Sequence, residues 1–169
     1  TGITKTDFGI FDFAKRISSI AYRYPNNVVR INASNSSTQN LIPIDTLVSY
    51  LMQTSEAVNL PSIMNFVAKN PVKNSLIIKF LSDNLPVDIV PTPDLDKSSL
   101  TTLEKLIDLG MSFTGGYSNI NPEFSTENLY KVVRNGNSEI TPASILRMLR
   151  YFTDNQISGK SISKTASTF

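Results

Sequence analysis

The sequence contains no His, no Cys and no Trp among its 169 residues. His titrates near neutral pH and is the commonest metal ligand, so its absence excludes Ser-His-Asp and Cys-His catalytic groups built from this chain alone. A structural zinc site needs Cys or His, and a disulfide needs two cysteines. The absences therefore exclude zinc fingers, thiol redox chemistry and disulfides. Carboxylate pairs, Ser/Lys dyads and Mg²⁺ bound by Asp or Glu remain open.

The composition is also shifted toward small polar residues. Asn, Ser and Thr make up roughly three residues in ten, well above ordinary usage. AT-rich genomes favour codons for Asn, Ile, Lys, Phe and Tyr, so compositional drift explains the missing residue types as well as selection does. We therefore expect a viral, phage or AT-rich microbial source, with the virion or the cytoplasm as the favoured location.

The length and hydrophobicity of the chain fit one domain. Hydrophobic residues make up 40% of the sequence, which is enough for a core, and 169 residues is an ordinary domain size. No apolar stretch approaches the length needed to cross a bilayer, so no membrane span is expected.

Apolar residues recur at helical spacing through much of the chain, and Pro and Asn punctuate these stretches. Thr101 and Glu104 have the spacing of a capping box, and Thr141 followed by Pro142 is a typical helix start. The spacing predicts helices over residues 7–24, 43–57, 60–69, 71–84, 99–109 and 125–135, and from residue 141 onward.

The evidence for strands is weaker. Residues 28–31 are β-branched, but residues 87–90 are their only candidate partner and are flanked by Pro86 and Pro91. We interpret residues 84–97 as an extended internal linker, or as a rigid arm laid across a neighbour. The sequence thus predicts an all-α fold, a single compact domain of six or seven short helices over residues 1–154, followed by a flexible tail over residues 155–169.

The net charge is only +2, but the charged residues are unevenly distributed. Residues 81–127 carry eight carboxylates and two lysines, a net charge of −6, whereas residues 128–169 carry a net charge of +4. Such segregation can steer association between unlike faces of identical subunits, or present one basic face to a phosphate backbone. The alternative is that folding intermixes the two segments.

Residues 128–152 have the most function-like pattern, a helix, a short turn at residues 136–138 and a second helix, similar in outline to a helix-turn-helix. Lys131 and Arg134 are three residues apart, as are Arg147 and Arg150, so each pair shares a helix face. We predict that these four side chains contact nucleic-acid phosphates. The alternative is an ordinary helical hairpin with solvated basic residues. The apolar residues expected to pack the two helices together are Leu129, Val132, Val133, Ile140, Ile145 and Leu149.

Three further patterns are weaker. Basic and aromatic residues cluster at residues 15–24, where Arg and Tyr can stack on single-stranded bases or cover the core edge. Residues 111–116 contain a Gly pair but lack the Lys and the Gly spacing of a phosphate-binding loop. Asp94 and Asp96 have no third carboxylate at EF-hand spacing. We therefore predict no metal site and no cofactor.

Three functional hypotheses follow from the sequence. The first is a non-enzymatic structural or assembly protein, viral or phage in origin, that forms homo-oligomers and associates with nucleic acid. Its copies would associate through unlike charged faces and through extended Pro-rich or tail segments. The second is a helix-turn-helix-like regulator that binds nucleic acid through residues 128–152. A small helical enzyme that uses carboxylates or hydroxyls comes last.

Overall fold

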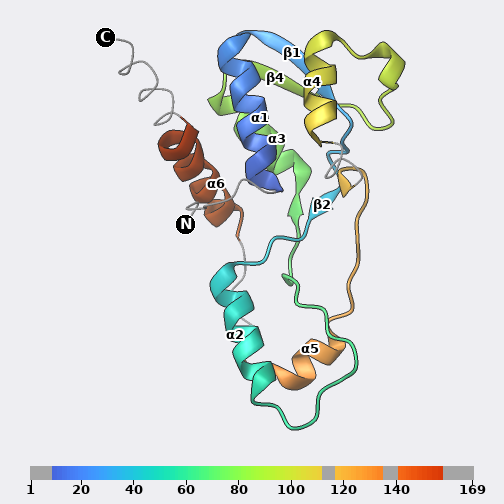
Figure 1. The fold of residues 1–169 in the computed structure, drawn as a ribbon, viewed down its shortest axis with the longest axis vertical. Helices are drawn as coiled ribbons and strands as arrows, with labels where there is room; N and C mark the ends of the chain where they lie inside the picture. The colour runs from blue at the N-terminus through green and yellow to red at the C-terminus, as the bar shows by residue number, and fades with distance from the viewer. Residues whose placement is uncertain (1–8, 112–116, 135–140, 158–169) are drawn as a thin grey trace.

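The computed structural model describes residues 9–111, 117–134 and 141–157. These residues form six α-helices and four short strands, so the fold mixes α and β structure and the all-α prediction is wrong. The elements are arranged as a larger body and a smaller lobe, which extended segments connect (Figure 1).

A parallel pair of strands crosses the body. Strand β1 (Asn27–Ile31) pairs with β4 (Val87–Pro91), with Asn27 opposite Val87 and Ile31 opposite Pro91. The prolines do not prevent pairing because they lie at the ends of the strand. The Pro86 carbonyl accepts from the Asn26 amide at 2.8 Å, and the Thr92 amide donates to the Ile31 carbonyl at 2.9 Å.

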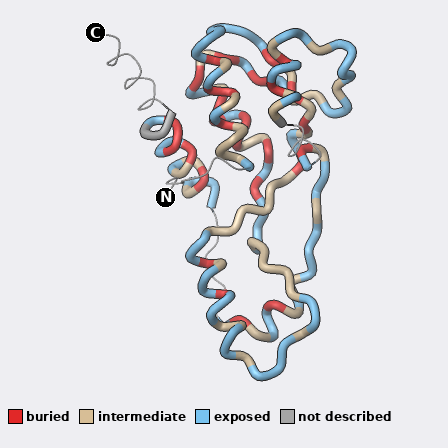
Figure 2. Tube along the Cα trace, in the orientation of Figure 1, coloured by how far each residue is buried: buried red, intermediate tan, exposed pale blue. Residues whose placement is uncertain are grey.

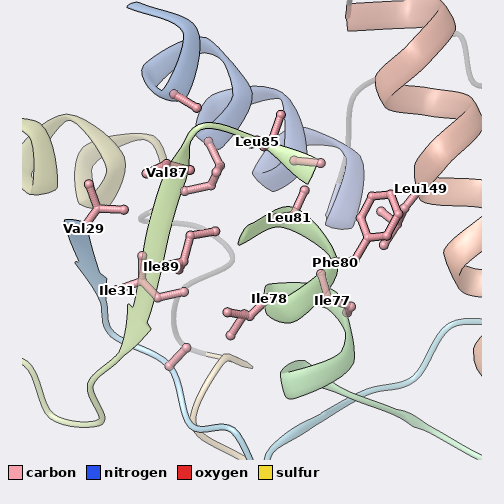
Figure 3. Packing of buried hydrophobic residues seen from close by; sticks show 14 of the residues in the cluster. Val29, Ile31, Ile77, Ile78, Phe80, Leu81, Leu85, Val87, Ile89 and Leu149 are labelled. Atoms are coloured by element: carbon pink, nitrogen blue, oxygen red, sulfur yellow. The ribbon is translucent and has the colours of Figure 1, made fainter. Parts of the chain in front are cut away.

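Helices surround this strand pair. Helix α3 packs against β4, α4 packs against β1 and α1, and α6 packs against α3. The buried faces of the strands and of α3 meet in one hydrophobic core, and Phe80 of α3 lies beside Leu149 of α6 (Figure 3). The helical elements of the body are α1 (Ile10–Arg23), α3 (Asn74–Asn84), the 3-10 helix η1 (Lys97–Ser99), α4 (Thr102–Met111), α6 (Pro142–Tyr151) and the π-helical segment η3 (Phe152–Ile157).

Two predicted side-chain caps, Thr101 and Thr141, are confirmed. The Thr141 hydroxyl accepts from the Ser144 amide at 3.2 Å, and Ser144 Oγ accepts from the Thr141 amide at 2.9 Å. The Glu104 amide donates to Thr101 Oγ1 at 3.3 Å, and the Glu104 carboxylate accepts from the Thr101 amide at 2.8 Å. In each case a reciprocal pair of bonds satisfies amides that have no partner within the helix.

The smaller lobe contains α2 (Ile44–Ser55) and α5 (Glu127–Val132). Its core is a small separate cluster in which Tyr50, Leu129 and Val133 are buried against Ile42 and Phe66. Most buried positions lie in the body, and the lobe is largely intermediate or exposed (Figure 2). A two-residue antiparallel ribbon, β2 (Thr38–Gln39) with β3 (Val72–Lys73), lies where the lobe meets the body.

Two predicted helices differ from the structure. Residues 60–69 are not helical, because side-chain amides bind their backbone instead: Asn40 bonds both backbone groups of Ala68, and Asn128 donates to the Ile63 carbonyl. Helix α3 begins at Asn74 rather than at residue 71, since residues 72–73 pair as β3. Asn70 and Pro71 therefore do not start a helix.

The end of the predicted domain also differs. Residues 152–157, which include the first three residues of the predicted tail, continue α6 as the π-helical segment η3. Residues 158–169 lie outside the described residues. Among the helices that the structure describes, none has the length and apolar character of a membrane span.

Candidate functional site

The outer face of α2 is the most unusual surface of the molecule. The helix starts after Pro43, whose extended backbone precedes the first turn, and Asp45 lies in that turn, where a carboxylate favours the helix dipole. Near its end, Thr54 Oγ1 donates to the Tyr50 carbonyl at 2.7 Å. These features make a regular helix of 12 residues.

The apolar side of α2 faces solvent. Ile44 is 72% exposed and Met52 60% exposed, and Val48 and Leu51 are also exposed. An amphipathic helix in a globular protein normally buries its apolar stripe against the core. In α2 the stripe instead points away from the lobe. We call this surface, made by Ile44, Val48, Leu51 and Met52, the α2 face.

The polar side of α2 faces the lobe. Thr46 and Tyr50 are the buried residues of the helix, and Gln53 Oε1 accepts from the Arg134 amide at 2.8 Å. Burial raises the pKa of the Tyr50 phenol, and the nearby Tyr130 adds to this effect. The Thr46 hydroxyl is buried without a partner among the described residues. The lobe is therefore fixed to the side of α2 that a solvated helix would normally expose.

The exposed apolar surface continues in the chain after α2. Val58, Leu60 and Ile63 are all exposed large hydrophobic residues in the loop that leads back to the body. Single exposed apolar residues are ordinary, but a run of them on one small lobe is typical of a surface that contacts another protein.

The four predicted basic residues fall into two separate pairs. Lys131 and Arg134 belong to the lobe, whereas Arg147 and Arg150 lie on α6 of the body. Leu129 and Val133 are buried in the lobe cluster, and Ile145 and Leu149 are buried in the body core. The residues expected to pack the two helices together thus belong to different cores. The predicted turn at residues 136–138 and Ile140 lie outside the described residues.

The basic side chains also differ in their partners. Lys131 Nζ lies 2.7 Å from Glu127 Oε1 and is neutralised. Arg134, Arg147 and Arg150 form no ion pair with any described residue, and Arg147 and Arg150 are both exposed on α6. Two of the four predicted residues therefore form an open basic surface on α6.

Half of the carboxylates in the acidic segment have a cationic partner within the chain. Four of the segment's eight carboxylates, Asp83, Glu104, Asp108 and Glu127, form ion pairs with Lys79, Arg30, Lys97 and Lys131. Glu104 is the one that is buried, and its bonds to Arg30 hold the pKa of the carboxyl at about 2. The charge segregation along the sequence is thus weaker in the folded chain.

The other predicted patterns have structural roles. Arg16 pairs with Asp12 at 2.8 Å, and the Arg23 guanidinium lies 5.7 Å from the Tyr24 ring centroid. Asp96 accepts from Ser98 at the start of η1, and these bonds lower the pKa of its carboxyl. Among the described residues, no three acidic side chains gather as metal ligands would. Residues 112–116, the Gly-pair loop, lie outside the described part.

The body contains a small pocket of about 130 Å³ between α1 and α3. Its walls include the apolar side chains of Ile10, Phe13 and Ile77, and its polar groups include Gln39 and Asn74. Gln39 Nε2 donates to Asn74 Oδ1 at 3.1 Å, so these two groups satisfy each other. This bond occupies one donor of Gln39 and the acceptor of Asn74.

Comparison with protein-family models, with curated proteins and with solved structures finds no significant match to this chain.

Sequence reasoning found α2 but not the direction of its apolar stripe. Helical periodicity shows that one face is apolar, and it does not show which side of the helix the rest of the chain covers. The sequence feature that could indicate which side is covered is the opposite face of the helix, where Tyr50 lies between Thr46 and Gln53. An aromatic residue with polar neighbours suits a small, partly polar contact such as the one in the lobe.

Proposed function

We propose that this chain is a non-enzymatic assembly protein that associates with copies of itself through the α2 face. The observation that carries this proposal is the inverted orientation of α2, with its apolar stripe in solvent and its polar side in the lobe. Covering such a stripe with a second apolar surface removes it from water, which is the main driving force for most protein association.

The role of charge in this proposal is smaller than the sequence suggested. Self-association through unlike charged faces needs the acidic segment to remain a charged surface, and half of its carboxylates are paired within the chain. A net charge of +2 is too small to keep two copies apart. We therefore propose that the α2 face supplies the driving force for association and that charge affects only how the copies are oriented.

Replacing Leu51 with Glu is expected to weaken self-association at least tenfold, which corresponds to about 1.4 kcal/mol. Leu51 lies in the centre of the α2 face, and a carboxylate there would be desolvated by the partner. Sedimentation equilibrium over a range of protein concentrations measures the change. Because Leu51 is exposed, the free energy of unfolding of the monomer should change by less than about 0.5 kcal/mol.

Leu109→Glu is the matched control for this experiment. Leu109 is an exposed leucine on a helix, at 75% exposure, but it belongs to α4 in the body. It should leave the association constant unchanged. A wild-type protein that stays monomeric at every concentration and ionic strength would contradict the proposal, as would equal effects of the two substitutions.

A second candidate function is nucleic-acid binding by α6. The observation that favours it is the exposed position of Arg147 and Arg150 without an ion pair to any described residue. Both side chains lie on one exposed helix face, since they are three residues apart. This form of the nucleic-acid-binding hypothesis uses only one face of α6 and does not need a packed helix-turn-helix.

The double substitution Arg147→Ala and Arg150→Ala is expected to weaken binding to mixed-sequence DNA or RNA at low salt. Each lost phosphate contact should reduce the slope of log K against log salt by roughly 0.7–0.9. Fluorescence anisotropy at several salt concentrations measures both quantities. Lys131→Ala is the control, since Lys131 already pairs with Glu127. Unchanged affinity and slope in the double variant would rule out this surface.

A further inference from the structure

We infer that two copies of the chain pair through an antiparallel, twofold contact of α2 with α2. This inference rests on the proposed self-association and adds its geometry. An isologous contact requires a surface that is complementary to itself, so the residues of one helix face must match the same face turned by 180°.

The spacing along α2 is suited to helix pairing. Ile44, Val48, Leu51 and Ser55 are separated by four, three and four residues, which is the alternation of core positions in a coiled coil. Val48 and Leu51 occupy the two central positions, a β-branched residue followed by Leu. All four residues are exposed, so a partner helix can approach this seam.

The order of side-chain sizes favours the antiparallel arrangement. Turning one helix around places Val48 opposite Leu51 of the second copy, and Ile44 opposite its Ser55. Each bulky end then meets a small residue, so the bulk is evenly distributed along the contact. A parallel pair would place Ile44 against Ile44 and Ser55 against Ser55, which is crowded at one end and empty at the other.

Charge does not contribute to this choice of arrangement. Gln53, which binds the Arg134 amide, lies on the polar side of α2 opposite the seam, so Arg134 is not held at the edge of the contact.

The size of the contact sets the expected strength. A helix of 12 residues is about 18 Å long, and its outer face is smaller than the roughly 800 Å² per partner of a standard interface. We therefore expect a reversible dimer in the micromolar range rather than a permanent one. The exposed loop residues Val58, Leu60 and Ile63 offer additional area near the same lobe.

Disulfide cross-linking of the full chain tests the geometry, because the natural sequence has no Cys and every cross-link reports an introduced pair. We expect a mixture of the Ile44→Cys and Ser55→Cys variants to form mixed disulfide dimers. Each variant alone should form several-fold fewer, because the two equivalent positions lie about 16 Å apart in the antiparallel pair, beyond the reach of a disulfide.

The outcomes separate the geometry from the proposed function. Cross-linking of the Ser55→Cys variant alone, to the level of the mixture, would indicate a parallel pair and overturn the inference while leaving self-association intact. A dimer in sedimentation that cross-links in no combination would place the contact elsewhere and also overturn it. No dimer in either measurement would overturn the proposed function itself.

Discussion

Replacing Glu104 with Gln is expected to lower the free energy of unfolding by about 2–3 kcal/mol at neutral pH. Glu104 is only 3% exposed, and its carboxylate is fully bonded. Oε1 accepts from the Arg30 amide at 2.9 Å and from Arg30 Nε at 2.8 Å, while Oε2 accepts from Arg30 Nη2 and the Thr101 amide, both at 2.8 Å. The Gln side chain would turn an N–H donor toward the N–H groups of Arg30 or Thr101. It would also remove the negative charge that pairs with the Arg30 guanidinium.

The same bonds make the stability of the chain depend on pH. They hold the pKa of Glu104 at about 2 in the folded state, against an ordinary value of 4.5. A carboxyl whose pKa is lowered by folding stabilises the folded state fully above its unfolded pKa, and this contribution is lost as the pH falls. The difference in stability between wild type and Glu104→Gln should therefore shrink progressively from about pH 4.5 toward pH 2.

Chemical denaturation at pH 7 and at pH 3 measures both effects, with Asp83→Asn as the matched control. Asp83 pairs with Lys79 at 2.9 Å, but both side chains are exposed on the surface of α3. Such a pair contributes about 0.5 kcal/mol or less. If the two variants lose equal stability, or if the Glu104→Gln difference is the same at both pH values, the buried ion pair is not the stabilising feature we describe.

Glu104 also shows which parts of the fold can be predicted from local sequence. The spacing of Thr101 and Glu104 predicted a capping box, and the structure confirms it. The partner Arg30 lies 74 positions away in the sequence, and no local pattern indicates it. The carboxylate satisfies the Arg30 amide on the side of β1 away from β4, so one residue both caps a helix and covers a strand edge.

The strands were harder to predict for the same reason. The β-branched character of residues 28–31 was recognised, and residues 87–90 were identified as the only candidate partner. The prolines that flank residues 87–90 argue against pairing in the middle of a sheet. In the structure the ladder ends at these prolines, so it does not need the amide hydrogens that they lack. Non-local pairing depends on how the intervening residues 32–86 fold, which sequence periodicity does not describe.

The candidate surface shows the same limit. The helix over residues 44–55 follows from its apolar spacing, and its exposure follows from the few apolar residues that the small lobe offers around Tyr50. The outward direction of Ile44 and Leu51 is a tertiary property. The predicted basic residues were separated for a related reason, because α5 and α6 pack on different cores.

The second large effect is expected at Asn74, where the lobe joins the body. Asn74 is buried, and its Nδ2 donates to the carbonyls of Ser34 and Ser118 at 3.2 and 2.9 Å. Its Oδ1 accepts from Gln39, and its backbone amide donates to the Ser37 carbonyl at 2.8 Å. One residue thus connects the start of α3 to two other segments, residues 34–39 and the segment at Ser118, and both lead toward the lobe.

Asn74→Ala should cost about 2–3 kcal/mol of unfolding free energy, because it removes three hydrogen bonds of a buried side chain and leaves the Gln39 amide without its Asn74 partner. The Ser34 and Ser118 carbonyls each keep one backbone bond. Asn74→Asp has nearly the same shape but turns an oxygen toward the two carbonyls, so it should be at least as destabilising at neutral pH and less so in acid. Thermal or denaturant unfolding measures both. Asn84→Ala is the control, since Asn84 is exposed and bonds only the Phe80 carbonyl of its own helix.

The Asn74 variants also test how the α2 face is presented. If Asn74 only stabilises the body, the Asn74→Ala variant should dimerise like the wild type under conditions where it remains folded. If it fixes the lobe to the body, amide hydrogen exchange in α2 and α5 should accelerate more than in α1, because the lobe has a small core of its own. We expect the second result, since β2 and the segment after Ser118 both lead from Asn74 to the lobe. Equal acceleration in all helices would contradict it.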